Sequence, residues 1–352
     1  MHALVFGAGA VGGYLGAKLI QAGWHVTFLG RPSFVQAVRS SGINLVEGDA
    51  SQNLTRLDAI TQWPPELQDQ PDFVLVTVKA YDCRQAAREI GETNWRIPII
   101  SFINGVGSES LLEDLLPDGW PVVAGTVTTA VQHPVPGRIQ VSKARGVGLA
   151  RHELADPLAR AFAATDVETR RYADPASMKW SKLMSNLIGN ATAAITGLSV
   201  GDIYRHPGLF RLELAALRET REVMSQSDLT PTRLPGVPIG WLAGALRLPA
   251  RLLQPLLIRA VAGGRGGKRP SMYYDVTKGR TEVDWLNGAV AARGAEFGLT
   301  TPANKLLTEQ VHKLAADAAS NKRSRMPAGT LLKLAAEAGV AGTAGYNPTG
   351  RP

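Results

Sequence analysis

A lysine and two asparagines recur at intervals of four residues in the segment 176–196, as Lys182, Asn186 and Asn190. If this segment is one helix, the three side chains drift by only about 40° and form a single polar stripe. Their neighbours are mostly apolar, which predicts a partly buried helix. One ammonium and two amides suit an oxo acid, and burial can lower the pKa of a lysine towards that of a useful general acid. The alternative is a solvent-facing stripe on an amphipathic helix.

A glycine-rich turn lies close to the N-terminus. The apolar residues 3–6 run into the sequence GAGAVG at 7–12, and helical spacing follows as far as Ala22. A strand, a G-x-G-x-x-G turn and a helix place backbone N–H groups and a helix N-terminus around a pyrophosphate. We therefore predict a dinucleotide site that includes Gly7, Gly9, Ala10, Val11 and Gly12.

The end of the second predicted strand, at 25–29, indicates which dinucleotide is bound. An NAD site usually has Asp or Glu about 20 residues after the turn, to accept a hydrogen bond from the ribose 2′-OH. Here no acid occurs between Gln21 and Val46, and Arg31 stands at the expected place, before a predicted helix that starts at Pro32. A cation beside a helix N-terminus suits a 2′-phosphate, so we predict NADP(H). The alternative is that Arg31 is an ordinary surface residue.

Further strands must position these groups. Apolar runs typical of buried parallel strands occur at 73–78, 97–102 and 122–125. Lys79 follows the first run and Asn104 follows the second. Because ligands of open α/β sheets bind beyond the carboxyl ends of the strands, both residues are expected near a cofactor or substrate. Either could instead be a solvated loop residue.

The organisation of the chain is predicted from these elements. Its 352 residues allow two domains, and its composition is that of an ordinary globular protein. We predict an α/β fold with a Rossmann-type parallel-sheet domain over 1–172 that binds NADP. An all-helical substrate and catalytic domain is expected over 173–340, because Asp174-Pro175 is typical of a helix start and the following sequence is rich in Ala and Leu. A loose tail is expected over 341–352.

Composition also excludes some functions. The formal net charge of +8 suits a polyanionic cofactor and a carboxylate substrate, and the basic residues are too scattered to predict nucleic-acid binding. The single cysteine, Cys83, and six histidines without ligand spacing predict no metal site. Neither a signal peptide nor an apolar run long enough to span a membrane is apparent, so a cytoplasmic location is expected.

An apolar and basic stretch at about 228–270 interrupts the second predicted domain. We consider a lid over the cleft, or a helical pair packed on the second domain or against another subunit of a homodimer. A less favoured alternative is contact of the 239–269 segment with a membrane surface.

Several motifs resemble those of one known family, the ketopantoate reductases. The matching segments, in family order, are Gly7-x-Gly9-x-x-Gly12 with Arg31, Thr77-Val78-Lys79-Ala80, Asn104-Gly105-Val106-Gly107, Trp180-x-Lys182-Leu183-x-x-Asn186 with Asn190, Ser271-Met272, and Arg280-Thr281-Glu282-Val283-Asp284-Trp285-Leu286-Asn287-Gly288. The resemblance implies a Rossmann domain, a helical domain and an NADPH cleft between them. It also implies that Lys182 is the general acid and that Glu282 is the partner of the substrate hydroxyl. The other roles that it implies are cofactor contacts for Arg31 and Lys79, and substrate or nicotinamide contacts for Asn104, Asn186, Asn190 and Ser271.

The function implied by the resemblance is NADPH-dependent reduction of 2-dehydropantoate to pantoate, in pantothenate and coenzyme A biosynthesis. One departure concerns the substrate, because Val200 stands where the family often has an asparagine that helps to hold it. Reduction of a different 2-oxo acid, or of an opine-like imine, therefore stays open. A non-catalytic NADP-binding protein is a third hypothesis, against which the presence of both Lys182 and Glu282 argues.

Overall fold

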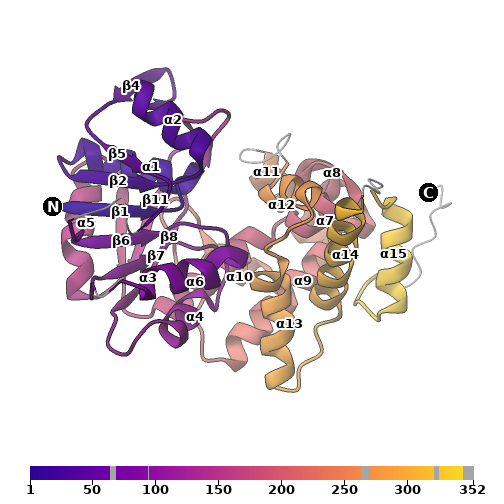
Figure 1. The fold of residues 1–352 in the computed structure, drawn as a ribbon. Coiled ribbons are helices and arrows are strands. Elements are labelled where there is room, and N and C mark those ends of the chain that lie inside the picture. The colour runs from indigo at the N-terminus through magenta and orange to yellow at the C-terminus, as the bar shows by residue number, and fades with distance from the viewer. Residues whose placement is uncertain (64–68, 94, 263–268, 321–324, 344–352) are drawn as a thin grey trace. The chain divides into compact units, whose positions relative to one another are not determined.

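The computed structural model describes residues 1–63, 69–93, 95–262, 269–320 and 325–343. The chain forms two compact units, of which unit 1 comprises Met1–Lys179 and Arg233–Val237 and unit 2 comprises Trp180–Thr232 and Pro238–Pro352 (Figure 1). Unit 1 contains the sheets, and the regular elements described in unit 2 are helical. The predicted α/β class, with a parallel-sheet domain followed by a helical one, is confirmed. Most of the predicted loose tail, from residue 344 onward, lies outside the described residues.

Unit 1 is built on an eight-stranded sheet with the order β12-β11-β8-β7-β6-β1-β2-β5. All neighbouring strands are parallel except β8 and β11. The strands are β1 (His2–Phe6), β2 (His25–Leu29), β5 (Asp58–Ile60), β6 (Phe73–Val76), β7 (Ile99–Ser101), β8 (Val122–Val127), β11 (Gly146–Ala150) and β12 (Glu168–Tyr172). The residues of β6 and β7 are all buried, as expected for central strands covered on both faces.

The register of the central strands brings three loops to one edge of this sheet. Phe6 of β1 pairs with Val76 of β6, and Val76 pairs with Ser101 of β7. From β1 the chain continues to β2 on one side of the pair, and from β6 it continues to β7 on the other side. The space between β1 and β6 is therefore a topological switch point of the sheet. The glycine turn and the segments that follow β6 and β7 therefore all begin at the same level of the sheet.

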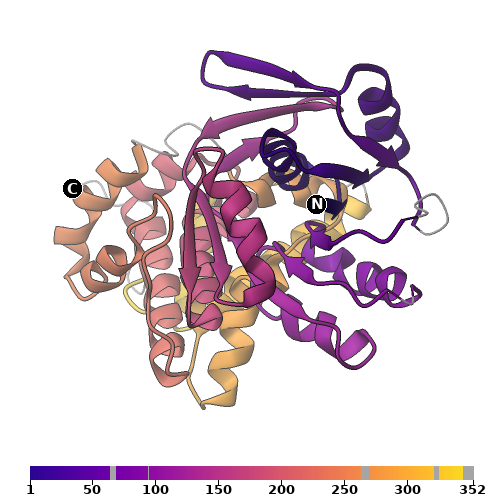
Figure 2. The same ribbon diagram turned by 90° about the vertical axis from the view of Figure 1, so that its left-hand side faces the viewer.

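A second, four-stranded sheet has the order β4-β3-β10-β9 (Figure 2). Its strands are β3 (Ile43–Glu47), β4 (Ala50–Leu54), β9 (Ala130–Gln132) and β10 (Arg138–Lys143). Helix α1 contacts β1 and β2 of the first sheet and β3, β9 and β10 of the second, so it packs between the two sheets. The helices that begin in unit 1 are α1 (Ala10–Gln21), α2 (Pro32–Ser41), α3 (Cys83–Gly91), α4 (Ser108–Leu115), α5 (Asp156–Ala163) and α6 (Pro175–Leu187).

Unit 2 packs its helices around a core of Leu, Ile, Val and Ala side chains. Its longest helices are α9 and α14, which contact each other. The helices are α7 (Asn190–Thr196), α8 (Val200–Arg205), α9 (Pro207–Gln226), α10 (Ile239–Ala245), α11 (Ala250–Ala262), α12 (Ser271–Asp275), α13 (Asn287–Glu296), α14 (Pro302–Ala319) and α15 (Ala328–Glu337). Within the described ranges, no helix is both long enough and apolar enough to cross a membrane.

The expectation of one continuous helix over 176–196 is wrong. Helix α6 ends at Leu187, and α7 begins at Asn190 after Gly189 with φ +64°. Glu213 of α9 stabilises this break, since its buried carboxylate accepts hydrogen bonds from Gly189 N at 2.6 Å and Thr192 Oγ1 at 2.5 Å. The change of direction means that Asn190 does not continue a single helical stripe from Lys182 and Asn186.

The described part of the basic stretch at 228–270 contains two helices, α10 and α11. Helix α11 contacts α8 and α9, and Leu253 and Leu257 are buried there. A helical pair packed on the second domain is therefore the arrangement found. Its outer surface exposes Trp241, Leu252 and Leu256 by 50%, 53% and 44%. Residues 263–268 of this stretch lie outside the described residues.

A carboxylate network joins three helices of unit 2. Glu219 of α9 accepts hydrogen bonds from the backbone N–H groups of Ala303 and Asn304, at 2.8 and 2.9 Å, and so caps the start of α14. The Asn304 side chain donates to Glu219 Oε2 at 2.8 Å and accepts from Asn287 Nδ2 of α13 at 3.0 Å. Burial raises the pKa of Glu219 from its ordinary value, and the hydrogen bonds to Asn304 and Ala303 oppose this only in part.

We expect Glu219 to make the stability of the protein depend on pH. Because the folded state holds the Glu219 proton more tightly than the unfolded chain, this contribution is complete below the ordinary pKa of 4.5 and is lost as pH rises through the raised value. Between weakly acidic and neutral pH, the free energy of unfolding of the Glu219→Gln variant should therefore decrease less than that of the wild type. Urea titrations at a series of pH values measure this difference, and an unchanged slope with pH would contradict the assignment.

Candidate active site

The glycine turn is shaped by close contact with the segment after β6. Gly7 has φ +105°, a conformation that side-chain-bearing residues rarely adopt, and its carbonyl accepts a hydrogen bond from Thr77 Oγ1 at 2.7 Å. A Cβ atom on Gly12 would lie 2.4 Å from Gly7 O and 2.5 Å from Thr77 Oγ1. Glycine is therefore required at both positions, because α1 starts directly against the end of β1.

Gly9 differs from these two glycines, because a Cβ atom there would meet nothing within 4 Å. The backbone at Gly9 thus borders open space just before α1, whose first residues are Ala10 and Val11. A helix N-terminus with accessible backbone N–H groups suits a phosphate group, so this turn fits the pyrophosphate of a dinucleotide. Ala10 and Val11 lie in the first turn of α1, directly after this turn.

Arg31 follows the last residue of β2 by two positions and caps the N-terminus of α2. Its carbonyl accepts hydrogen bonds from Phe34 N and Val35 N, while its side chain is exposed. Within the described ranges, its guanidinium forms no ion pair or hydrogen bond with the protein. It is therefore available to an anionic ligand, as a 2′-phosphate partner must be.

Lys79 and Asn104 are placed by the neighbouring strands at the same edge of the sheet. Lys79 follows β6 by three residues and Asn104 follows β7 by three residues, and both side chains are half-buried. The Asn104 loop is held by Lys179 of α6, whose Nζ donates to the carbonyl of Ile103 at 2.6 Å. The same Nζ forms an ion pair with Glu109 Oε1 at 2.8 Å.

Lys179 is a residue that the sequence analysis did not identify. Its side chain is only 6% exposed and that of Glu109 is 18% exposed. A sequence signal was present, because Lys179 precedes Leu183 and Leu187 by four and eight residues, on the apolar face of α6. A lysine on such a face requires a buried partner.

Lys182 and Asn186 lie on the other, less buried side of α6 and contact each other. Lys182 Nζ donates a hydrogen bond to Asn186 Oδ1 at 2.9 Å, and both side chains are half-buried. The adjacent residues Leu183, Met184 and Ser185 are buried. The spacing of four residues therefore produces an ammonium–amide pair with a defined orientation.

Asn190 connects α7 to the segment that begins at Ser271. Its side chain is 4% exposed, and its Oδ1 accepts a hydrogen bond from Met272 N at 3.3 Å. Ser271 is the first residue of α12, and its side chain is exposed. The structure therefore brings Asn190 and the Ser271 segment together through a hydrogen bond from a backbone N–H to the Asn190 side chain.

Glu282 is a buried carboxylate, 4% exposed, just before a 3₁₀ helix at Val283–Trp285. Two other polar residues of its motif have partners elsewhere in unit 2. Asp284 is exposed, and its Oδ1 lies 2.8 Å from His312 Nε2; Asn287 belongs to the Glu219 network. Of the two acidic residues in the motif, Glu282 is buried and Asp284 is exposed.

The comparisons with known proteins identify the family. The family model described as "Ketopantoate reductase PanE/ApbA" matches residues 3–152, and its C-terminal counterpart matches residues 174–315. The chain belongs to the ketopantoate reductase family. Membership makes it an oxidoreductase that acts on a keto or hydroxyl group.

Relatives of known name align along almost the whole chain. A 2-dehydropantoate 2-reductase of Halobacterium salinarum is 28% identical over 88% of this chain and 98% of its own length. One from Archaeoglobus fulgidus is also 28% identical, over 87% and 95%. The crystal structure of a PanE/ApbA family ketopantoate reductase from Ralstonia eutropha superposes with a TM-score of 0.77 and 27% identity, covering 91% of this chain and all of that one.

The same fold occurs in an enzyme with a different name. The ternary structure of D-mandelate dehydrogenase with NADH and anilino(oxo)acetate has a TM-score of 0.75 and 20% identity, covering 91% of this chain and 99% of that one. At this level of identity the similarity concerns the fold alone.

Val200, the departure from the family's motif, is a core residue in this ketopantoate reductase family member. It is fully buried at the start of α8, and a Cβ atom on Gly189 would lie 2.7 Å from its Cγ1. Val200 therefore packs against the break between α6 and α7. It supplies no polar group to a ligand.

Proposed function

We propose that this chain is an NADPH-dependent reductase that converts 2-dehydropantoate to pantoate, a step in pantothenate and coenzyme A biosynthesis. The observation that carries the proposal is the hydrogen-bonded Lys182–Asn186 pair, in a chain of this family. The pair places a cation and an amide on a half-buried helix face. Reduction of a 2-oxo acid requires a proton donor at the carbonyl oxygen and a group that orients this donor.

The cofactor assignment rests on unit 1. Gly7, Gly9 and Gly12 form the turn for the pyrophosphate, with Ala10 and Val11 in the first turn of α1. Arg31 is the partner that we assign to the 2′-phosphate. Lys79 and Asn104, which follow adjacent strands at the same sheet edge, complete the proposed cofactor site, and Asn104 also serves the substrate.

The residues of unit 2 carry the proposed chemistry. When bound, the nicotinamide supplies a hydride to the carbonyl carbon of the substrate. Lys182 donates a proton from Nζ to the carbonyl oxygen, and its charge stabilises the negative charge that develops there. Asn186 orients Nζ through its 2.9 Å hydrogen bond. Glu282 accepts a hydrogen bond from the substrate hydroxyl, and Asn190 and Ser271 line the substrate site.

The direct test is an assay of the purified protein with NADPH and 2-dehydropantoate. The absorbance of NADPH should decrease only when the protein and 2-dehydropantoate are both present. Pantoate should form in an amount equal to the NADPH consumed. Tight NADPH binding without turnover of any 2-oxo acid would contradict a catalytic function and support a non-catalytic NADP-binding protein.

We expect Arg31→Gln to weaken the preference for NADPH over NADH. Loss of a charge-assisted contact to a phosphate should reduce the ratio of kcat/KM for the two cofactors by about 10- to 100-fold. Arg160→Gln, which removes an exposed arginine from α5, is the control for net charge. An unchanged ratio in Arg31→Gln would show that another residue selects the cofactor.

Reduction of a different 2-oxo acid, or of an opine-like imine, is a second candidate function. It is favoured by Val200, whose buried apolar side chain replaces the asparagine expected in the family. A panel of 2-oxo acids, with and without an amine, distinguishes the two candidates. A kcat/KM for another substrate well above that for 2-dehydropantoate would establish the second.

A further inference from the structure

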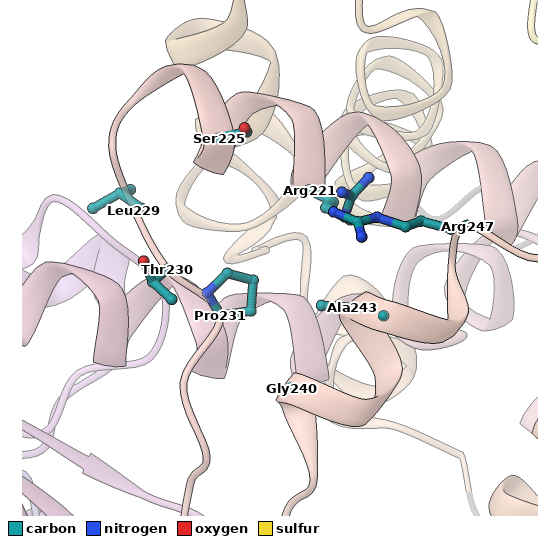
Figure 3. A pocket seen from close by; sticks show the side chains of 9 residues that line it. Arg221, Ser225, Leu229, Thr230, Pro231, Gly240, Ala243 and Arg247 are labelled. Atoms are coloured by element: carbon teal, nitrogen blue, oxygen red, sulfur yellow. The ribbon is translucent and has the colours of Figure 1, made fainter.

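A pocket of about 350 Å³ lies within unit 2, between the C-terminal part of α9 and the helix α10 (Figure 3). It contains none of the residues assigned above to the cofactor or the substrate. Its volume is within the usual range for small-molecule sites. The lining residues are Arg221, Ser225, Leu229, Thr230, Pro231, Gly240, Ala243, Gly244 and Arg247.

Two arginines converge on this pocket. Arg221 comes from α9 and Arg247 from the turn after α10, and their guanidinium groups point toward one another (Figure 3). In the part of the chain that the structure describes, neither guanidinium forms a hydrogen bond or an ion pair with the protein. Two facing cations without a counter-charge repel each other, so an anion between them would be stabilised by both.

A nearby arginine, Arg218, differs from the two pocket arginines because its guanidinium is bound to the protein. Arg218, one turn before Arg221 on α9, donates to the carbonyls of Leu246 and Leu248, at 2.9 and 2.7 Å. Arg218 thereby fixes the turn that carries Arg247, while Arg221 and Arg247 are left to the pocket. The backbone that presents Arg247 is thus held in place without using either of the two pocket arginines.

The charged residues that line the pocket are of one sign. No Asp or Glu occurs in the sequence between Asp228 and Asp275, and the described residues that line the pocket include no acid. Hydroxyl groups come from Ser225 and Thr230, and the remaining wall is apolar or small. Arginine forks combined with hydroxyl groups suit the several acceptor oxygens of a phosphate.

We propose that this pocket is a second ligand site that binds a small organic phosphate. The phosphate group lies between Arg221 and Arg247, and the organic part contacts the apolar wall formed by Leu229, Pro231 and Ala243. The site is independent of the proposed reductase function, because it shares no residue with it.

Binding is measured by calorimetry and by the ³¹P NMR shift of the ligand, with the full chain saturated with NADPH so that the proposed cofactor site is filled. The probes are phenyl phosphate and inorganic phosphate, with succinate as a dianion that lacks phosphorus. We expect phenyl phosphate to bind more tightly than inorganic phosphate, and both more tightly than succinate. Equal binding of all three, or no binding at millimolar concentration, would overturn the proposal.

Three variants locate the site. Arg221→Gln and Arg247→Gln should each weaken phenyl phosphate binding by about 10-fold or more, since each removes a charge-assisted hydrogen bond. Gly244→Leu should abolish binding with both arginines present, because a Cβ atom at Gly244 meets nothing within 4 Å and the side chain would occupy the pocket. Arg251→Gln, an exposed arginine on α11 outside the pocket, should bind as the wild type does.

The controls separate this site from general charge effects. Equal weakening in Arg251→Gln and Arg247→Gln would show a diffuse effect of net charge and overturn the proposal, as would unaltered binding in Gly244→Leu. Circular dichroism and the unfolding midpoint of each variant show that the helices are intact. The reductase assay is a separate readout. Failure of the phosphate-site proposal can therefore be distinguished from failure of the proposed reductase function.

Discussion

Replacement of Lys182 by alanine is expected to lower kcat by about 10²- to 10⁴-fold, the contribution usual for a general acid. Binding of NADPH should be almost unchanged, because Lys182 is assigned to the reacting carbonyl rather than to the cofactor. Steady-state assays of NADPH consumption give kcat, and fluorescence titration gives the dissociation constant. A kcat equal to that of the wild type would contradict the proposed role of Lys182.

Two further variants separate proton donation from positioning. Lys182→Arg keeps the charge but replaces a compact donor with a planar group that does not deprotonate, so it should stay impaired. Asn186→Ala removes the acceptor of the 2.9 Å hydrogen bond and leaves the lysine present. We expect it to lower kcat less than Lys182→Ala and to shift the pH profile of kcat, which a merely structural effect would not do.

The second large effect is expected at Lys179 and concerns stability. Lys179→Met removes one partner of a buried ion pair and leaves Glu109, 18% exposed, without its counter-charge. Breaking such a pair costs about 3–5 kcal/mol, so the free energy of unfolding of unit 1 should fall by that order. Urea denaturation followed by tryptophan fluorescence and by circular dichroism measures this loss, with separate transitions examined because the chain has two compact units.

The double variant Lys179→Met/Glu109→Met tests the cause of this loss. Replacing both partners by apolar groups should recover a large part of the stability, because no uncompensated charge then remains. Lys182→Met on the same helix is the matched control and should unfold nearly as the wild type does, since its side chain is only half-buried. Equal destabilisation by both lysine replacements would contradict the distinction between the two residues.

The sequence was sufficient to predict the fold class and the strand, glycine turn and helix at the N-terminus. Apolar runs, the glycines at 7, 9 and 12, and Arg31 follow one another within a short stretch, and each depends mainly on local geometry. The hydrogen bond between Lys182 and Asn186 was also accessible, since residues four apart on a helix are neighbours.

Other features depended on residues far apart in the chain. The sequence predicted a helix continuing through Gly189, but Glu213, which lies 24 residues later, stabilises a break there. The same break places Asn190 against Met272 rather than in line with Lys182. Helical periodicity contains no information about a buried carboxylate from another helix, so this error followed from local reasoning.

By itself, the sequence determined a Rossmann-type domain, a helical domain, a family and the residues that could carry the chemistry. The tertiary structure alone decided which of two lysines three residues apart is buried in an ion pair and which is half-buried beside an amide. It also decided where the polar helix face ends and that Arg221 and Arg247 share a pocket. The physical reason is that periodicity and turn chemistry act between near neighbours, while burial and charge pairing depend on contacts between distant segments.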